Sequence, residues 1–251
     1  MKEYKILDIK VQTIPEHILK IKLQDFLTSY QQHQIVTANP EFVVASRKND
    51  QFKDIINNAS LSTIDGSGII MALQFLGYDI SLDDRLTGVR LSEILIDMAV
   101  NKNYKILFCL YSKGMTKPDK FFMKINEKYP ALDFQVADEK TALDKARLFG
   151  PQIILVGFGA PKQDIWINKN ISKIPSVKIA VGVGGTFDYM SGKIKRAPKI
   201  FRSLGLEWFW RLLRQPSRIF RINRAVMVFP YLIIKDRILK NKQKKHGKST
   251  N

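Results

Sequence analysis

Cysteine and histidine are scarce in this chain of 251 residues, and their scarcity excludes several kinds of site. The one cysteine, Cys109, cannot form an intramolecular disulfide and leaves too few thiols for a cysteine-based zinc site. The three histidines, His17, His33 and His246, are scattered along the sequence. We therefore predict no metal site and no cofactor.

Long apolar runs are also missing. The longest, Ala225–Ile234, contains Pro230 and is much shorter than the roughly 20 residues of a membrane-spanning helix. The chain opens with the charged segment Met1–Lys5, which is unlike a secretory signal. We expect a cytoplasmic protein that is at most peripherally associated with the inner face of the cell membrane.

Acidic residues are rare at one end of the chain only. Residues 192–251 contain 17 of the 41 lysines and arginines but only two of the 23 acidic residues, so the rest is nearly neutral. We predict an α/β catalytic core (1–195), a membrane-associating helical appendage (196–240) and a disordered basic tail (241–251). The basic excess favours a polyanionic partner: nucleic acid, anionic lipid headgroups or a diphosphate substrate.

Short apolar runs alternate with segments of helical periodicity through the core, which is typical of parallel α/β sheets. The predicted strands are Tyr4–Ile9, Ile35–Ala38, Leu61–Ile64, Lys105–Leu110, Leu132–Val136, Ile153–Val156 and Val177–Val183. The predicted helices are Ile14–Tyr30, Glu41–Ser46, Ile69–Leu76, Leu91–Asn101, Lys117–Tyr129, Thr141–Phe149 and Gln163–Asn170. We expect a doubly wound, mostly parallel, Rossmann-like α/β sheet with a C-terminal basic helical appendage.

Small or polar residues follow four of the predicted strands, at Thr37–Asn39, Asp65–Gly68, Gly157–Gly159 and Gly182–Thr186. In an open α/β sheet, ligands bind beyond the carboxyl ends of the strands. The four turns therefore predict a crevice at this edge.

The turn from Gly157 to Lys162 is not a dinucleotide fingerprint, because its sixth position is lysine, and this disfavours a nicotinamide or flavin enzyme. It still leads into a helix N-terminus, where a phosphate is favoured, although an ordinary strand–helix turn has the same composition. The nucleotide-binding residues that we predict are Gly157, Gly159, Pro161, Gly182 and Gly184.

Asp65 follows a strand and precedes two glycines, so its carboxylate could act as a general base in the crevice. The alternative is an aspartate that accepts hydrogen bonds from amides of its own turn. Asp188, after the second glycine-rich turn, has the same two interpretations, and we count it among the predicted substrate-binding residues.

Arginines recur every three or four residues from Arg211 to Arg224, with apolar residues between them. Pro216 is expected to divide this stretch into two helices. A basic amphipathic segment that also carries Trp208 and Trp210 favours the headgroup region of a membrane. An amphipathic helix that packs on the core and exposes a basic face is the alternative.

Several motifs occur together in one order along the chain, and most are weak signals when taken singly. They are Thr37-Ala-Asn-Pro-Glu, Asp65-Gly-Ser-Gly, Arg85-Leu-Thr-Gly, Gly157-Phe-Gly-Ala-Pro-Lys-Gln, Lys195-Arg-Ala-Pro and Gly205-Leu-Glu-Trp. In this order, from about Val36 to Arg224, the sequence resembles the WecG/TagA/CpsF family of glycosyltransferases.

The resemblance implies an inverting, metal-independent enzyme that helps to synthesise a cell-surface polysaccharide, such as teichoic acid or capsule. Such an enzyme moves a sugar from a UDP-sugar donor, often UDP-N-acetylmannosamine, to an undecaprenyl-diphosphate-linked saccharide at an anionic membrane surface. By this resemblance Asp65 is the base. The same resemblance implies substrate-binding roles for Thr37, Asn39, Arg85, Gln163, Arg214, Arg221 and Arg224.

Two segments, Leu107–Gly114 and Phe134–Glu139, differ from the pattern that the family usually shows, so the donor sugar is left open. From other classes, the chain could be a nucleic-acid-binding α/β protein or a non-catalytic membrane-docked scaffold. No recognisable RNA- or DNA-binding motif is present, so we expect no nucleic-acid partner. The sequence is compatible with a homo-oligomer and does not define the oligomeric state.

Overall fold

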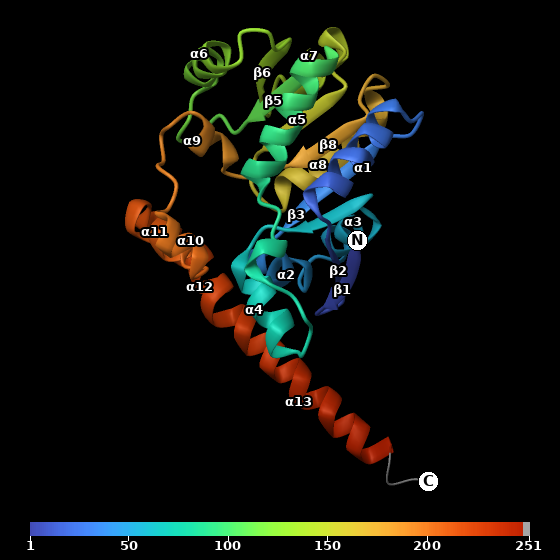
Figure 1. Ribbon diagram of the computed structural model, residues 1–251, viewed down its shortest axis with the longest axis vertical. Coiled ribbons are helices and arrows are strands. Elements are labelled where there is room, and N and C mark those ends of the chain that lie inside the picture. Colours follow the sequence, from blue (N-terminus) through green and yellow to red (C-terminus); the bar gives the residue numbers. More distant parts are fainter. Residues whose placement is uncertain (248–251) are drawn as a thin grey trace.

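The computed structural model describes residues 1–247, in which eight strands form one sheet with helices on both faces (Figure 1). The strands, in the order in which they lie side by side, are β1 (Lys2–Ile6), β2 (Ile9–Thr13), β4 (Leu61–Ile64), β3 (His33–Ala38), β8 (Ile179–Gly182), β7 (Ile153–Gly157), β5 (Ile106–Leu110) and β6 (Phe134–Asp138). All pairs from β2 to β6 are parallel. The predicted doubly wound, mostly parallel sheet is therefore confirmed.

The seven predicted helices of the core are present, and further helical segments are additional. In chain order the helical segments are α1 (Glu16–Thr28), α2 (Pro40–Ser46), α3 (Asp50–Asn58), α4 (Ser67–Phe75), η1 (Leu82–Asp84), α5 (Gly88–Lys102), α6 (Pro118–Lys128), α7 (Ala142–Phe149), α8 (Lys162–Asn170), η2 (Ile171–Lys173) and α9 (Thr186–Met190). The additional segments are α3, the short α9 and the 3-10 turns η1 and η2. The longest addition is α3, a largely polar helix in which only Phe52, Ile55 and Ile56 are buried.

The N-terminal segment differs from the prediction, in which Tyr4–Ile9 forms a single strand. It forms an antiparallel hairpin of β1 and β2, with Ile6 paired to Ile9. The two turn residues, Leu7 and Asp8, have φ angles of 45° and 71°. Tight hairpins need such left-handed residues, but they usually use Asn-Gly or Asp-Gly, so the sequence carries no recognisable turn signal here.

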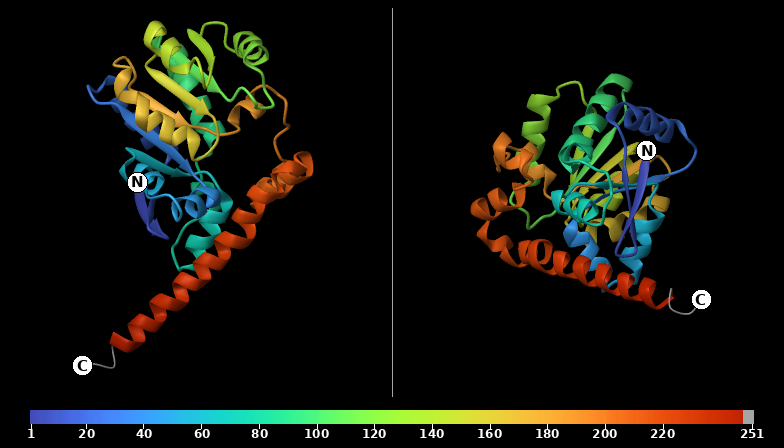
Figure 2. Two further views of the ribbon diagram at one scale, coloured as in Figure 1. Left: turned by 180° about the vertical axis from the view of Figure 1, so that it is seen from behind. Right: turned by 60° about the horizontal axis from the view of Figure 1, so that its bottom comes forward.

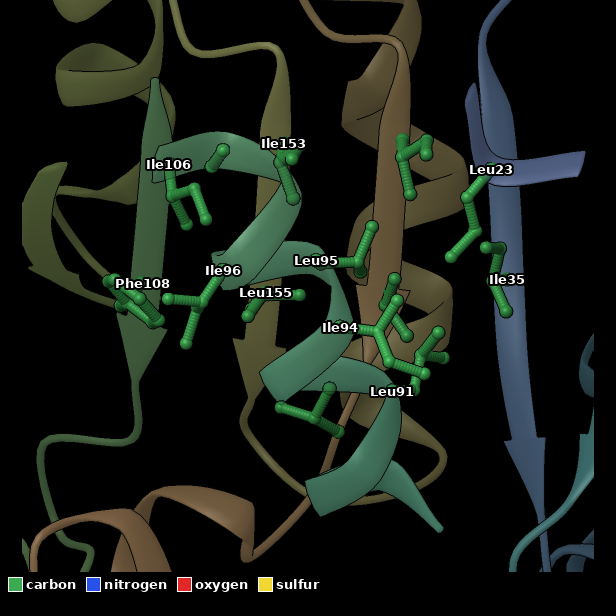
Figure 3. Packing of buried hydrophobic residues seen from close by; sticks show 14 of the residues in the cluster. Leu23, Ile35, Leu91, Ile94, Leu95, Ile96, Ile106, Phe108, Ile153 and Leu155 are labelled. Atoms are coloured by element: carbon green, nitrogen blue, oxygen red, sulfur yellow. The ribbon is translucent and has the colours of Figure 1, made fainter. Parts of the chain in front are cut away.

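The central strands are buried on both faces, which explains their unbroken apolar sequences. In β5, Ile106 and Phe108 belong to the core on the side of α5, whereas Leu107 and Cys109 belong to a core on the opposite side. Figure 3 shows leucines and isoleucines of α5 packed over β5 and β7. This packing covers one face of the sheet with α5.

The appendage consists of α10 (Lys199–Ser203), α11 (Glu207–Arg214), η3 (Pro216–Arg218), α12 (Ile219–Asn223), the π-helical segment η4 (Arg224–Val228) and α13 (Phe229–Gly247). The predicted break at Pro216 is present as η3. Helix α13 runs past α4 and projects from the body of the molecule (Figures 1 and 2). It reaches Gly247, within the range for which the sequence predicted disorder; residues 248–251 lie outside the described part.

Part of the appendage packs on the core. Phe229 and Ile233 are almost fully buried in a cluster with Phe42 of α2 and Ile70 of α4. Many other large apolar side chains of these helices stay exposed. Over residues 1–247, no helix combines the length and the apolar content that crossing a membrane requires.

Candidate active site

A cavity of about 620 Å³ lies between the carboxyl ends of the strands and the appendage. Its volume is typical of small-molecule pockets, roughly 300–1,000 Å³. The predicted residues that line it are Thr37, Asn39, Asp65, Arg85, Gln163, Gly184 and Arg221. Those that do not line it, within residues 1–247, are Gly157, Gly159, Pro161, Gly182, Asp188, Arg214 and Arg224.

Asp65 directly follows β4 and is partly buried. Its Oδ1 accepts a hydrogen bond of 3.3 Å from the backbone N–H of Gly88, at the start of α5. Burial raises the pKa of Asp65 from its usual 3.8 to about 6, against the hydrogen bond from Gly88 and the positive charges of Arg211 and Arg85. A carboxyl with this pKa is ionised at neutral pH and still basic enough to accept a proton.

Thr37 and Asn39 each have a structural hydrogen bond. The Thr37 hydroxyl donates to the Gly182 carbonyl at 2.8 Å, joining the ends of β3 and β8. The Asn39 side-chain oxygen caps α2 by accepting from the backbone N–H of Glu41 at 2.9 Å. This capping engages the oxygen of Asn39 and gives its amide nitrogen no role in the helix.

Gln163 is almost completely buried and holds two glycine turns together. Its Oε1 accepts hydrogen bonds from the backbone N–H groups of Gly159 at 3.1 Å and Gly184 at 3.0 Å. Gly182 leaves the space for this side chain, since a Cβ there would lie 2.5 Å from the Gln163 Nε2. Gln163 therefore sets the shape of the turns after β7 and β8.

The remaining predicted site residues of the core do not line the cavity and have structural contacts instead. A Cβ on Gly157 would lie 2.6 Å from the ring of Phe187, so this glycine permits close packing. Pro161 is the N-cap residue of α8. Asp188 accepts a hydrogen bond of 2.9 Å from the Thr116 hydroxyl, which ties α9 to the loop after β5.

Arg85 connects the core to the appendage. Its Nη1 lies 2.7 Å from Oε2 of Glu207, the first residue of α11, and the Arg85 side chain is only 11% exposed. A second ion pair, 2.7 Å between Arg221 Nε and Glu41 Oε2, joins α12 to α2. Charged contacts from two core elements thus hold the appendage over the cavity.

Two arginines outside the predicted set, Arg211 and Arg218, line the cavity. Arg211 stacks over the ring of Tyr189 at 5.2 Å, and its Nε and Nη2 are buried without a hydrogen-bond partner within the described residues. Burial, together with the charges of Arg211 and Arg221, lowers the pKa of Arg218 to about 10, so it is still cationic at neutral pH. This unsatisfied positive charge suits a phosphate-bearing ligand.

Gly185 lets these guanidinium groups approach the turn after β8. A Cβ on residue 185 would overlap Nη2 of Arg211 and lie 3.5 Å from Nη2 of Arg218. By contrast, Arg214 and Arg224 are exposed, and Arg214 lies over the ring of Trp210 at 4.8 Å.

A second carboxyl, Asp164, lies next to Gln163 and is fully buried. Neither of its carboxyl oxygens has a hydrogen-bond partner in the described part of the chain. Burial raises its pKa from 3.8 to about 7. Among the side chains that the structure describes, no three of His, Cys, Asp or Glu gather in a way that could hold a metal ion.

Comparison of the sequence with known proteins assigns it to a family. The model of the glycosyl transferase WecG/TagA/CpsF family matches residues 4–243. A Staphylococcus aureus (strain MW2) protein named N-acetylglucosaminyldiphosphoundecaprenol N-acetyl-beta-D-mannosaminyltransferase is 31% identical over 207 residues, 80% of this chain and 79% of that protein. A protein of the same name from Bacillus spizizenii (strain ATCC 23059 / NRRL B-14472 / W23) is 32% identical over 190 residues, 73% of this chain and 72% of its own length. The chain therefore belongs to the WecG/TagA/CpsF family of glycosyltransferases.

Proposed function

We propose that this enzyme transfers a sugar from a UDP-sugar, UDP-N-acetylmannosamine or a related UDP-hexose, to an undecaprenyl-diphosphate-linked saccharide. The proposed reaction inverts the anomeric centre, needs no metal ion and takes place at the cytoplasmic face of the membrane during cell-surface polysaccharide synthesis. The observation that carries the proposal is the pairing, within one cavity, of the Asp65 carboxyl with the guanidinium groups of Arg211 and Arg218. The names of the two relatives support the acceptor and the transferred sugar.

Asp65 is the general base of the proposed mechanism. Its carboxylate accepts the proton of the acceptor hydroxyl while the hydroxyl oxygen forms a bond to the anomeric carbon of the donor sugar. The bond between that carbon and the UDP oxygen breaks in the same step, and UDP leaves. Attack on the face opposite to UDP inverts the anomeric centre. The pKa of about 6 gives a mainly ionised carboxylate at neutral pH, as this role requires.

The leaving diphosphate gains negative charge as its bond to the sugar breaks, and cations must offset that charge. Arg211 and Arg218 supply fixed positive charge beside the turn that contains Gly185. The Arg211 guanidinium has N–H groups free to donate, so it can bind a diphosphate oxygen without first breaking an internal hydrogen bond. In this proposal the arginines of the appendage do the work that a divalent cation does in other transferases.

The test is a transfer assay with a panel of UDP-sugars and a synthetic N-acetylglucosamine diphospholipid, with and without a chelator of divalent cations. We expect UDP-N-acetylmannosamine or a close analogue to be turned over equally in both conditions. An NMR spectrum of the product reports the anomeric configuration, and we expect β-linkage from an α-linked donor. No turnover with any UDP-sugar contradicts the proposed reaction; turnover that stops on chelation contradicts metal independence alone.

A further inference from the structure

One end of the cavity is polar and the other is apolar. The polar lining contains Asp65 and the arginines, whereas the apolar lining comes mainly from α4 and α13. These two helices lie near each other in Figure 1. Helix α4 contributes Met71, Ala72 and Phe75 to the apolar wall. None of these side chains takes part in the chemistry proposed above.

The facing wall comes from consecutive turns of the appendage helix. Its lining residues recur in adjacent pairs, every fourth residue: Ala225 and Val226, Phe229 and Pro230, Ile233 and Ile234. The first pair lies in the π-helical segment η4, and such segments often occur at functional sites. Arg221 precedes Ala225 by one helical turn, so the apolar wall begins where the arginine end of the cavity stops.

The apolar end is open to the surface. Met71, Phe75 and Ile234 are 44%, 47% and 48% exposed, although they are apolar and line a cavity. Beyond them, Arg237 lies over the Phe75 ring at 4.5 Å and donates a hydrogen bond of 2.7 Å to the Phe75 carbonyl. The groove therefore has a charged inner end, an apolar middle and a basic outer rim.

We propose that this groove, which we call the α4–α13 groove, binds the first isoprene units of the acceptor lipid. The inference rests on the proposed function, in which the acceptor is a polyprenyl diphosphate. Such a molecule joins an anionic diphosphate directly to a branched apolar chain. The groove likewise joins a positively charged inner end directly to an apolar wall. A nucleotide or a free sugar has no apolar part that would need this wall, and an apolar ligand without charge would leave the arginines unpaired.

The groove would also set the direction of the acceptor. A chain held between α4 and α13 leads away from Asp65 and leaves the cavity past the exposed side chains of Met71, Phe75 and Ile234. The rest of the lipid can then remain in the membrane while the saccharide reaches the base. Recognition of the chain, in addition to the diphosphate, makes the enzyme selective for lipid-linked acceptors over soluble ones.

The experiment measures KM for soluble N-acetylglucosamine diphosphate esters with a methyl, dimethylallyl, geranyl or farnesyl group, in the absence of membranes. For the unaltered enzyme we expect KM to fall at least about tenfold from the methyl to the farnesyl ester, because each added apolar carbon is buried. Ala225→Leu and Ala72→Leu narrow the groove from opposite walls. In both variants KM for the farnesyl ester should rise to about the value for the methyl ester, so that the dependence on chain length disappears.

Ile238→Asp is the matched control, since Ile238 is exposed on α13 and does not line the cavity. It should keep the full dependence on chain length. Equal KM values for all esters in the unaltered enzyme overturn the inference and leave the proposed transferase standing. The inference is also overturned if Ile238→Asp removes the dependence on chain length as completely as Ala225→Leu does. That result would assign chain binding to the outer face of α13.

A second measurement separates the groove from the proposed reaction. Binding of farnesyl diphosphate and of inorganic diphosphate is compared by calorimetry without donor. If no ester is a substrate, the proposed function fails, yet tighter binding of farnesyl diphosphate that is lost in Ala225→Leu still supports the groove. If the two compounds bind equally, the groove is refuted whatever the transfer assay gives. Circular dichroism melting of each variant checks that it folds.

Discussion

Arg85 and Glu207 form an ion pair of 2.7 Å that joins the core to the first turn of α11, beside the Asp65 carboxyl. The Glu207 carboxylate acts on Asp65 as well as on Arg85, because its negative charge adds to the effect of burial in raising the pKa of Asp65. The contact that holds the appendage in place therefore also tunes the proposed base.

Glu207→Gln should shift the acidic side of the pH–rate profile. In the unaltered enzyme, kcat/KM should fall as the pH decreases through about 6, where Asp65 takes up a proton. Removing the negative charge of Glu207 lowers the pKa of Asp65, so activity in the variant should persist to lower pH. The measurement is kcat/KM from pH 5 to 8, and Glu41→Gln is the control because Glu41 pairs with Arg221 instead. An unchanged acidic limb would show that Glu207 does not act on the base.

Asp65→Asn should lose activity and gain stability at alkaline pH. A general base typically contributes about 10²- to 10⁴-fold to the rate, so we expect a loss of this size in transfer. The raised pKa means that the folded state binds the proton more tightly than the unfolded state does, so folding stability falls as pH rises from 3.8 to about 6. At pH 8 the substitution should recover at most about 3 kcal/mol of unfolding free energy, and below pH 4 it should recover none.

Asp164→Asn provides the matched comparison. Asp164 is also a buried carboxyl with a raised pKa, about 7, but it does not line the cavity. By the same sign argument, its replacement should stabilise the protein at pH 8, by at most about 4 kcal/mol, and not at pH 3. Transfer should stay within a few-fold of the unaltered enzyme. Thermal melts at the two pH values, together with the transfer assay, separate a buried acid from a catalytic one.

Arg211→Met and Arg218→Met should each lower kcat/KM by about 10²-fold or more, whereas Arg214→Met and Arg224→Met should change it only a few-fold. Loss of one fixed positive charge or donor at a developing oxyanion typically has an effect of this size. Arg211 and Arg214 both belong to α11, whereas Arg218 and Arg224 flank α12 on its two sides. The pairs differ in exposure, and only Arg211 and Arg218 line the cavity. The measurement is kcat/KM for the donor; a larger loss in Arg214→Met than in Arg211→Met would contradict the assignment.

These arginines illustrate what the sequence can and cannot predict. Arg211, Arg218 and Arg221 have the same spacing, seven and then three residues, as Arg214, Arg221 and Arg224, so spacing alone cannot select the set that faces the cavity. The turn at Gln215 and Pro216 interrupts the helix and makes periodicity across it uninformative. Only the packing of α11 and α12 on the core decides between them.

The strand ends were more predictable. Asp65 and Thr37 reach the cavity because the carboxyl ends of parallel strands share one edge, a rule that needs only the order of strands and helices. The same rule could not tell that Gly157 and Gly182 serve close packing, or that Gln163 holds two turns together, because those roles depend on side chains from distant segments. The α4–α13 groove likewise has no sequence pattern of its own.

Association with anionic membranes remains a prediction, and the exposed apolar residues of the appendage define how to test it. Phe220 is 78% exposed on α12, so Phe220→Asp should leave thermal stability unchanged. We expect it to weaken sedimentation with vesicles of anionic phospholipid about tenfold, because an aromatic anchor is lost and a negative charge is added near negative headgroups.

Leu148→Asp is the control, since Leu148 is 89% exposed but lies on α7, in the core domain. Raising the salt concentration should weaken binding of the unaltered protein, because the basic residues of the appendage contribute through screened attraction. Equal loss in both variants would show that any exposed apolar side chain suffices, and would refute a membrane-binding face on the appendage.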